Sequence, residues 1–221
     1  LYSPPMTAAH PPPNAADTRE RIIDAASRVL RRRGYAGAGI DAMAAEAGLT
    51  SGAIYGHFRG KRALLTAVVE ASVQANESVR EHGLDALQGA PWVRALLRRY
   101  LSPEHHAAVE AGCPIPALVS ELGRAGEEPQ RAFAQTLEQL LERMETRWRT
   151  DDDDADADAN DGNSDEMDDA SRRQRVLAAL AMAVGGMSLA RAVGDDPLGR
   201  ELLAACRSHG VSALIDSDDD T

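Results

Sequence analysis

The chain has 221 residues, enough to bury a substantial core, and only 4% of them are aromatic while helix-forming Ala, Leu, Arg and Glu abound, which disfavours a β-sandwich. Its formal net charge is −11, from 24 Lys and Arg against 35 Asp and Glu, a balance that by itself argues against a nucleic-acid partner. Two cysteines outside any CxxC pair are too few for a disulfide-stapled secreted fold, so a reducing cytoplasm is expected.

The first part of the chain predicts short helices behind a proline-rich start. Residues 1–16 contain five prolines and are expected to form a disordered leader. Thr18 is expected to cap a first helix that stops at Gly34. The helices expected here cover about 18–33, 40–47 and 51–58, followed by a long one from Lys61. Nine bases against four acids give residues 18–62 a net charge of +5, which is typical of a DNA-binding head.

The rest of the chain continues the helical pattern. Helices are expected from about 89 to 100, over 129–148, over 171–193 and over about 198–210, with an acidic, frayed tail at 211–221. Residues 151–169 hold ten Asp and one Glu with no base, so this segment carries the chain's whole net charge. So much like charge predicts a flexible, solvated loop in preference to a DNA mimic or a calcium site.

No membrane segment is expected in this chain. No apolar run approaches the roughly 20 residues that cross a bilayer, and residues 1–13 carry three consecutive prolines where a signal peptide has an apolar core. A cytoplasmic protein is therefore predicted.

Residues 40–58 contain the three parts of a helix-turn-helix: a short support helix, a turn with a glycine (Gly48), and a second short helix. The wider stretch Thr18–Leu65 has the order basic helix, Gly-Tyr, second helix, Ala-Gly-Leu-Thr turn, Tyr-x-His-Phe and Lys. This order closely resembles the DNA-binding domain of the TetR (tetracycline-repressor-like) family.

The resemblance implies an all-α fold with two parts. A three-helix, helix-turn-helix DNA-binding domain is expected at 17–62, and a helical effector-binding and dimerisation bundle at 63–210. It also implies a homodimer on double-stranded operator DNA, with the last two long helices, here about 128–149 and 171–193, packed against the partner. Because Gly185 and Gly186 interrupt the later helix, close packing is expected there, either across the dimer or within one chain.

The DNA-contacting residues are also implied by the resemblance. Tyr55, His57 and Lys61 stand where the family commonly contacts phosphates, although Tyr55 could instead belong to the core. The residues at the start of the third helix are expected to contact the bases. Their hydroxyls can donate or accept hydrogen bonds, and a small side chain and a glycine allow the backbone to approach the DNA closely. The expected set is Gly39, Thr50, Ser51, Gly52, Ala53, Tyr55, His57 and Lys61.

One departure from the family lies at the start of the second helix. The family usually has Thr or Ser there, and this sequence has Ala38-Gly39. The hydroxyl cap is lost, but Gly is a tolerable cap and bare backbone N–H groups can still hold a phosphate. Weaker positioning on DNA is expected, without loss of binding.

The effector site is less well marked. Trp92, Tyr100 and Cys113 are candidate walls for an unknown small molecule, and each could equally be packing. Cys113 lies at an expected helix start, and some TetR-like regulators sense electrophiles or oxidants through cysteine, whereas a lone cysteine often serves as a small buried hydrophobe. An enzyme would need Cys113 with His105 or His106 as base, but no orienting acid is evident and both histidines are expected to be exposed.

Two functional hypotheses follow. The first is a ligand-responsive repressor that binds a palindromic operator as a homodimer and is released by a small molecule. The second is a helical protein-interaction module of the same fold that has lost operator binding, favoured only by Ala38-Gly39 and the acidic run. Neither requires a catalytic residue, a metal or a cofactor.

Overall fold

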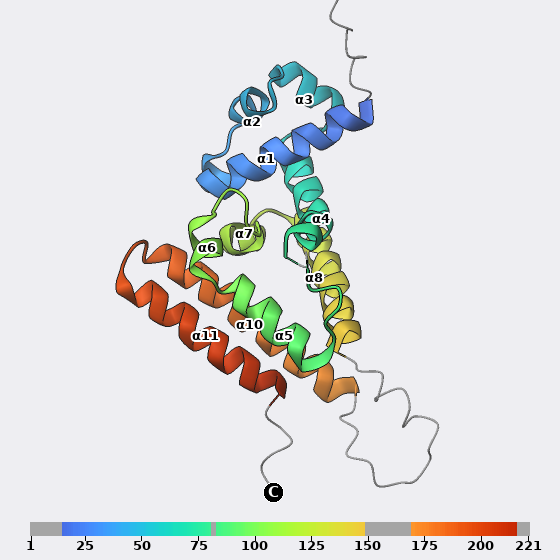
Figure 1. The fold of residues 1–221 in the computed structure, drawn as a ribbon. Coiled ribbons are helices and arrows are strands. Elements are labelled where there is room, and N and C mark those ends of the chain that lie inside the picture. The colour runs from blue at the N-terminus through green and yellow to red at the C-terminus, as the bar shows by residue number, and fades with distance from the viewer. Residues whose placement is uncertain (1–14, 81–82, 149–168, 216–221) are drawn as a thin grey trace, which may run out of the picture.

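The computed structural model describes residues 15–80, 83–148 and 169–215, and in these ranges it contains ten helices and no strand. The all-α prediction is therefore confirmed. A head of three helices stands on a larger helical body (Figure 1). Three expected segments, the leader up to residue 14, the acidic loop from 151 to 168 and the tail from 216 to 221, lie outside the described residues.

The helices follow the predicted order, with shifted ends at both termini. Those of the head and its supporting strut are α1 (Ala15–Gly37), α2 (Ile40–Ala47), α3 (Ser51–His57) and α4 (Lys61–Arg80). Those of the body are α5 (Gly89–Tyr100), α6 (Pro103–Ala107), α7 (Ile115–Leu122), α8 (Glu127–Trp148), α10 (Asp169–Ala192) and α11 (Pro197–Ile215). The expected cap at Thr18 is wrong, because α1 already begins at Ala15. The tail expected from residue 211 is helical up to Ile215, since α11 continues.

Two glycines shape the head as the sequence predicts. Gly34 has φ 66° and ψ 174°, a conformation that breaks the regular helix inside α1. Gly48 ends α2 in the left-handed region, with φ 65°, and its N–H donates to the carbonyls of Ala44 and Ala45. These two turns set the angles at which α1, α2 and α3 meet.

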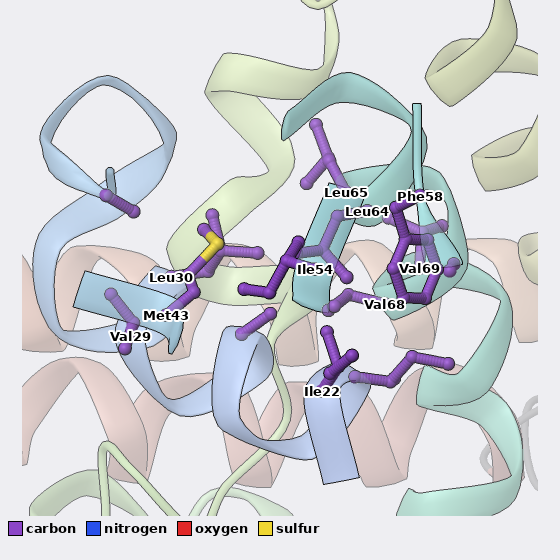
Figure 2. Close-up of a cluster of buried hydrophobic side chains, with 14 of the residues drawn as sticks. Ile22, Val29, Leu30, Met43, Ile54, Phe58, Leu64, Leu65, Val68 and Val69 are labelled. Atoms are coloured by element: carbon purple, nitrogen blue, oxygen red, sulfur yellow. The ribbon is translucent and has the colours of Figure 1, made fainter. Parts of the chain in front are cut away.

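The first hydrophobic core joins the head to α4 (Figure 2). Ile22 and Leu30 of α1, Met43 of α2, Ile54 of α3 and Leu64 of α4 are all completely buried. Each such side chain contributes about 1.5–3 kcal/mol by leaving water. The spacing of apolar residues in the sequence therefore predicted this core correctly.

The same core reaches into the body. Leu118 and Leu122 of α7 and Ala132 of α8 belong to it. The head is thus packed against α7 as well as α4, and α8 packs behind α4, so the orientation of the head depends on residues far away in the sequence.

The second core fills the space between α5, α8, α10 and α11, around Trp92, Leu141 and Met187. The last two long helices are α10 and α11, which pack closely together. The expectation that 128–149 and 171–193 are the last two long helices is therefore wrong, because α11 follows them, while their packing against a dimer partner stays a prediction. Helix α8 instead lies against α4, as Figure 1 also shows.

One described helix corrects the expectation about apolar runs. Residues Ala170–Ala192 are long and apolar enough to cross a membrane by length and composition. This signal is weak, because core helices of soluble proteins pass the same test, and here α10 contacts α6, α7, α8 and α11.

Candidate nucleic-acid interface

The exposed edge of the head is built by the start of α2 and by α3. Gly39 caps α2 in an extended conformation, φ −88° and ψ 155°, without a side-chain hydrogen bond. A Cβ added at Gly39 would meet no atom within 4 Å, so the start of α2 is open. The preceding Ala38 is completely buried in the first core. Free backbone N–H groups at this point suit a phosphate oxygen.

The start of α3 is held by two side-chain hydrogen bonds. The Oγ1 of Thr50 accepts from the backbone N of Ala53 at 3.2 Å, which confirms Thr50 as the cap. The Oγ of Ser51 donates to Oδ1 of Asp41 on α2 at 2.5 Å. Thr50 and Gly52 are exposed, whereas Ser51 and Ala53 are half-buried. The helix that would enter a groove is therefore rigid at its leading end.

The far end of α3 separates core from surface residues. Ile54 and Phe58 are buried, at 0% and 5% exposure, and anchor α3 to the head. Tyr55 is 60% exposed, so the alternative that it belongs to the core is wrong. His57 is half-buried in the last turn of α3. An exposed phenol on a well-anchored helix is a suitable donor to a phosphate.

Lys61 has partners within the head. Its ammonium lies 4.4 Å from the centre of the Tyr35 ring, and its Nζ donates to the carbonyl of Ala36 at 3.4 Å. A cation over an aromatic face is attracted by about 0.5–1 kcal/mol at exposed sites. Lys61 thus ties the start of α4 to the end of α1, and a phosphate contact would have to be made from this position.

Some basic side chains of the head form ion pairs or hydrogen bonds within it, whereas others are exposed. Arg28 and Arg32 of α1 both pair with Glu46, at 2.9 and 2.5 Å, and the pKa of Glu46 is lowered by these hydrogen bonds. Arg21 donates to the carbonyl of Ala47 at 2.9 Å. Several arginines that give the sequence its basic head therefore hold α1 to α2. Exposed Arg59, beside α3, is better placed to meet DNA.

Comparison with known proteins agrees with this architecture. Residues 22–68 match the family model described as bacterial regulatory proteins, tetR family. The HTH-type transcriptional regulator SrpR of Pseudomonas putida is 49% identical over 55 residues, 25% of this chain and 26% of SrpR. The HTH-type transcriptional regulator LmrA of Bacillus subtilis is 29% identical over 121 residues, 52% of this chain and 63% of LmrA. Residues 22–68 therefore carry a TetR-family DNA-binding sequence, and the chain is similar to TetR-family regulators.

Solved structures extend the likeness to the whole fold of this chain. A TetR transcriptional regulator from Chloroflexus aurantiacus has a TM-score of 0.69 at 21% identity, covering 91% of this chain and 96% of that one. The reduced form of NemR from E. coli has a TM-score of 0.67 at 18% identity, covering 92% and 100%. At such low identity the likeness concerns the fold alone. The chain spans less than two thirds of the length of SrpR and of LmrA.

The three expected effector residues all lie in the second core. Trp92, Tyr100 and Cys113 are 2%, 5% and 1% exposed. The expectation of exposed histidines is wrong, because His105 and His106 are half-buried. The ring of His105 lies edge-on to Tyr100 and accepts from the backbone N of Cys113 at 3.2 Å. That contact uses the backbone of Cys113, so it does not make a thiol–imidazole dyad.

Sequence reasoning missed the residues that join the head to the body. Glu121 of α7 accepts from two backbone N–H groups that follow Gly34. Arg31 donates to the carbonyl of Gly112 at 2.6 Å, and burial lowers the pKa of its guanidinium. These pairs are about 80 residues apart in the sequence, and no local pattern connects their members.

Proposed function

We propose that this chain is a TetR-family, DNA-binding transcriptional regulator of the cytoplasm, which acts as a repressor on a palindromic operator. The observation that carries the proposal is the exposed edge of Thr50, Gly52 and Tyr55 on a helix anchored by Ile54 and Phe58. A short helix with polar and small residues at its leading end fits the major groove, and flanking hydroxyl and backbone donors fit phosphates.

A homodimer is part of this proposal, and one face of α10 supports it. Leu177 and Leu189 are 45% and 56% exposed on α10, and Leu198 at the start of α11 is 49% exposed. Between the first two lies Gly185, where an added Cβ would meet nothing within 4 Å. A line of exposed leucines and an open glycine suits a closely packed partner helix. Two heads that bind two half-sites together would be more specific for their DNA than one head on one half-site.

An effector site around Trp92 is the second part of the proposal. Its indole Nε1 is buried and has no hydrogen-bond partner among the described residues. An unsatisfied buried donor costs about 1–3 kcal/mol, which a ligand acceptor would relieve. Because Cys113, in the same core as Trp92, is itself buried, an apolar molecule with one acceptor fits this core better than an electrophile that must reach the thiol. Such an effector would release DNA by favouring a different orientation of the heads.

The decisive test is binding to the DNA that flanks the gene. Fluorescence anisotropy would compare this duplex with a scrambled one at two salt concentrations, using the full chain. Selective binding that weakens steeply with salt is expected, because phosphate contacts release counterions. Equal, weak binding to both duplexes would contradict the proposal and favour a protein-interaction module. Replacing Tyr55 by Phe should lower the affinity, and exposed Arg33 on the far end of α1 offers a control site.

A further inference from the structure

We propose that Glu121 is a positioning residue that fixes the angle of the DNA-binding head on the body and thereby sets the half-site spacing that a dimer accepts. This inference rests on the proposed function, since it concerns two heads on one operator. It assigns a role to a residue that touches no DNA.

The first support is the way in which the carboxylate holds the chain after Gly34. Its Oε2 accepts from the backbone N of Tyr35 at 2.5 Å, and its Oε1 accepts from the backbone N of Ala36 at 3.0 Å. Both oxygens of one side chain are thus used on two successive amides of the head. Hydrogen bonds to an ionised acceptor are about twice as strong as neutral ones. Two of them from one carboxylate fix both the distance and the orientation of the head relative to α7.

Gly34 makes this close approach possible. A Cβ at Gly34 would lie 2.9 Å from Oε2 of Glu121, a distance that real Cβ contacts do not reach. The backbone of Gly34 has a φ of 66°, which residues other than glycine rarely adopt. This conformation turns the next two N–H groups toward α7. The kink in α1 and the carboxylate of α7 therefore form one joint between head and body.

Flanking contacts restrain the same joint. Arg31 donates to the carbonyl of Gly112, and Arg32 pairs with Glu110 at 3.0 Å, so α1 is held by the segment that precedes α7. On the other side, Lys61 holds Ala36 and the Tyr35 ring. The short stretch after Gly34 is thereby clamped between α7 and the start of α4.

On the body side, the joint is in contact with α10, the helix proposed to form the dimer. Helix α10 packs against α6 and α7, and Arg191 on α10 donates to the carbonyl of His105 at 2.8 Å. The hydroxyl of Ser188 lies 2.8 Å from the carbonyl of Val184 in its own helix and 3.1 Å from that of Pro116. Helix α10 thus holds α6 and α7, which hold α1 through Glu121. In a dimer built on α10, the angle at Glu121 would decide how far apart the two α3 helices lie. The half-site spacing that a dimer accepts is set by this separation of the two α3 helices.

The test measures spacing selectivity, which general destabilisation would not change. Full-length wild type, Glu121→Ala and Glu121→Gln would be titrated onto the operator and onto versions with one or two base pairs added or removed between its half-sites. Glu127→Gln on α8 is the matched control, because it removes the same charge from the body and Glu127 has no ion pair among the described residues. An isolated half-site measures the head alone.

We expect Glu121→Ala to bind the operator with the native spacing on the order of tenfold more weakly. When the heads tilt freely, the effective concentration of the second head at its half-site is lower. Its affinities for the different spacings should become more nearly equal, while its affinity for an isolated half-site stays unchanged. Glu121→Gln, which keeps one acceptor oxygen, should lie between, and Glu127→Gln should match wild type. If Glu121→Ala keeps the wild-type order and ratio of spacings, the inference is overturned.

A second variant guards against misfolding of Glu121→Ala. Gly34→Ala should disturb the same joint from the head side, and it should widen spacing tolerance in the same direction. Amide hydrogen exchange would check that Tyr35 and Ala36 lose protection in each variant while the body keeps its own. Unchanged protection of these two amides in Glu121→Gln would also overturn the inference. Absence of any selective DNA binding by wild type would instead contradict the proposed function, so the two failures are distinguishable.

Discussion

The hydroxyl of Ser51, the first residue of α3, donates its hydrogen bond to Oδ1 of Asp41 on α2. A serine hydroxyl has one hydrogen to donate and two lone pairs. With that hydrogen used, Ser51 can make the base contact proposed for it as an acceptor only. The support helix therefore influences what the recognition helix can read.

Breaking this pair should loosen sequence discrimination. Asp41→Ala frees the Ser51 hydroxyl and removes a negative charge from the side that faces DNA, so affinity for a scrambled duplex should rise several-fold. Asp41→Asn removes the charge and retains an acceptor, which separates the two effects. Anisotropy titrations on operator and scrambled DNA would measure both. Wild-type discrimination in both variants would show that Asp41 does not restrain Ser51 on DNA.

Removing the cap of α3 should destabilise the head. Thr50→Ala loses the acceptor for the Ala53 N–H and should cost about 1 kcal/mol of unfolding free energy, whereas Thr50→Ser should retain most of it. Urea denaturation followed by circular dichroism gives the comparison. Equal midpoints for the alanine and serine variants would argue against a contribution of this cap.

Acid should weaken the pairing of α1 with α2. Hydrogen bonds from Arg28 and Arg32 lower the folded-state pKa of Glu46 below its ordinary value. A carboxyl of this kind contributes stability above its unfolded-state pKa of about 4.3, and that stability is lost as the pH falls through the folded-state pKa. Glu46→Gln should therefore be less stable than wild type at neutral pH and approach it in acid. A difference independent of pH would contradict this.

Two adjacent glycines of α10 should respond differently to the same change. A Cβ at Gly186 would lie 2.6 Å from Sγ of Cys206 on α11, so Gly186→Ala should destabilise the fold by about 1–3 kcal/mol. Gly185→Ala meets no atom of its own chain within 4 Å and should stabilise the monomer by about 0.5–1 kcal/mol through helix propensity, while weakening the proposed dimer. Thermal denaturation and analytical ultracentrifugation separate the two effects. A dimer that tolerates Gly185→Ala without loss would place the interface elsewhere.

The unsatisfied indole of Trp92 gives a test of the effector site. Trp92→Phe removes the orphan donor and keeps an aromatic ring, so the effector should release DNA only at about tenfold higher concentration, as expected for one lost hydrogen bond. Operator affinity without effector should stay the same. If the response to effector is unaltered, the effector does not use this N–H group.

The order and extent of most helices were determined by the sequence itself, because they depend on local patterns. The stop of the first helix at Gly34 and the turn at Gly48 each involve residues only a few positions apart, and each is found as predicted. The family resemblance of residues 18–65 has the same local origin.

Only the tertiary structure decided which polar residues are free to act. Arg28 and Arg32, which help to make the head basic in sequence, are paired with Glu46 within it, and Lys61 holds Tyr35. Gly185 and Gly186 look alike in the sequence, yet one is open to solvent and the other lies against α11. The joint of Glu121 with Tyr35 spans 86 residues. Contacts at that separation arise from the packing of whole helices, which no local pattern of residues records.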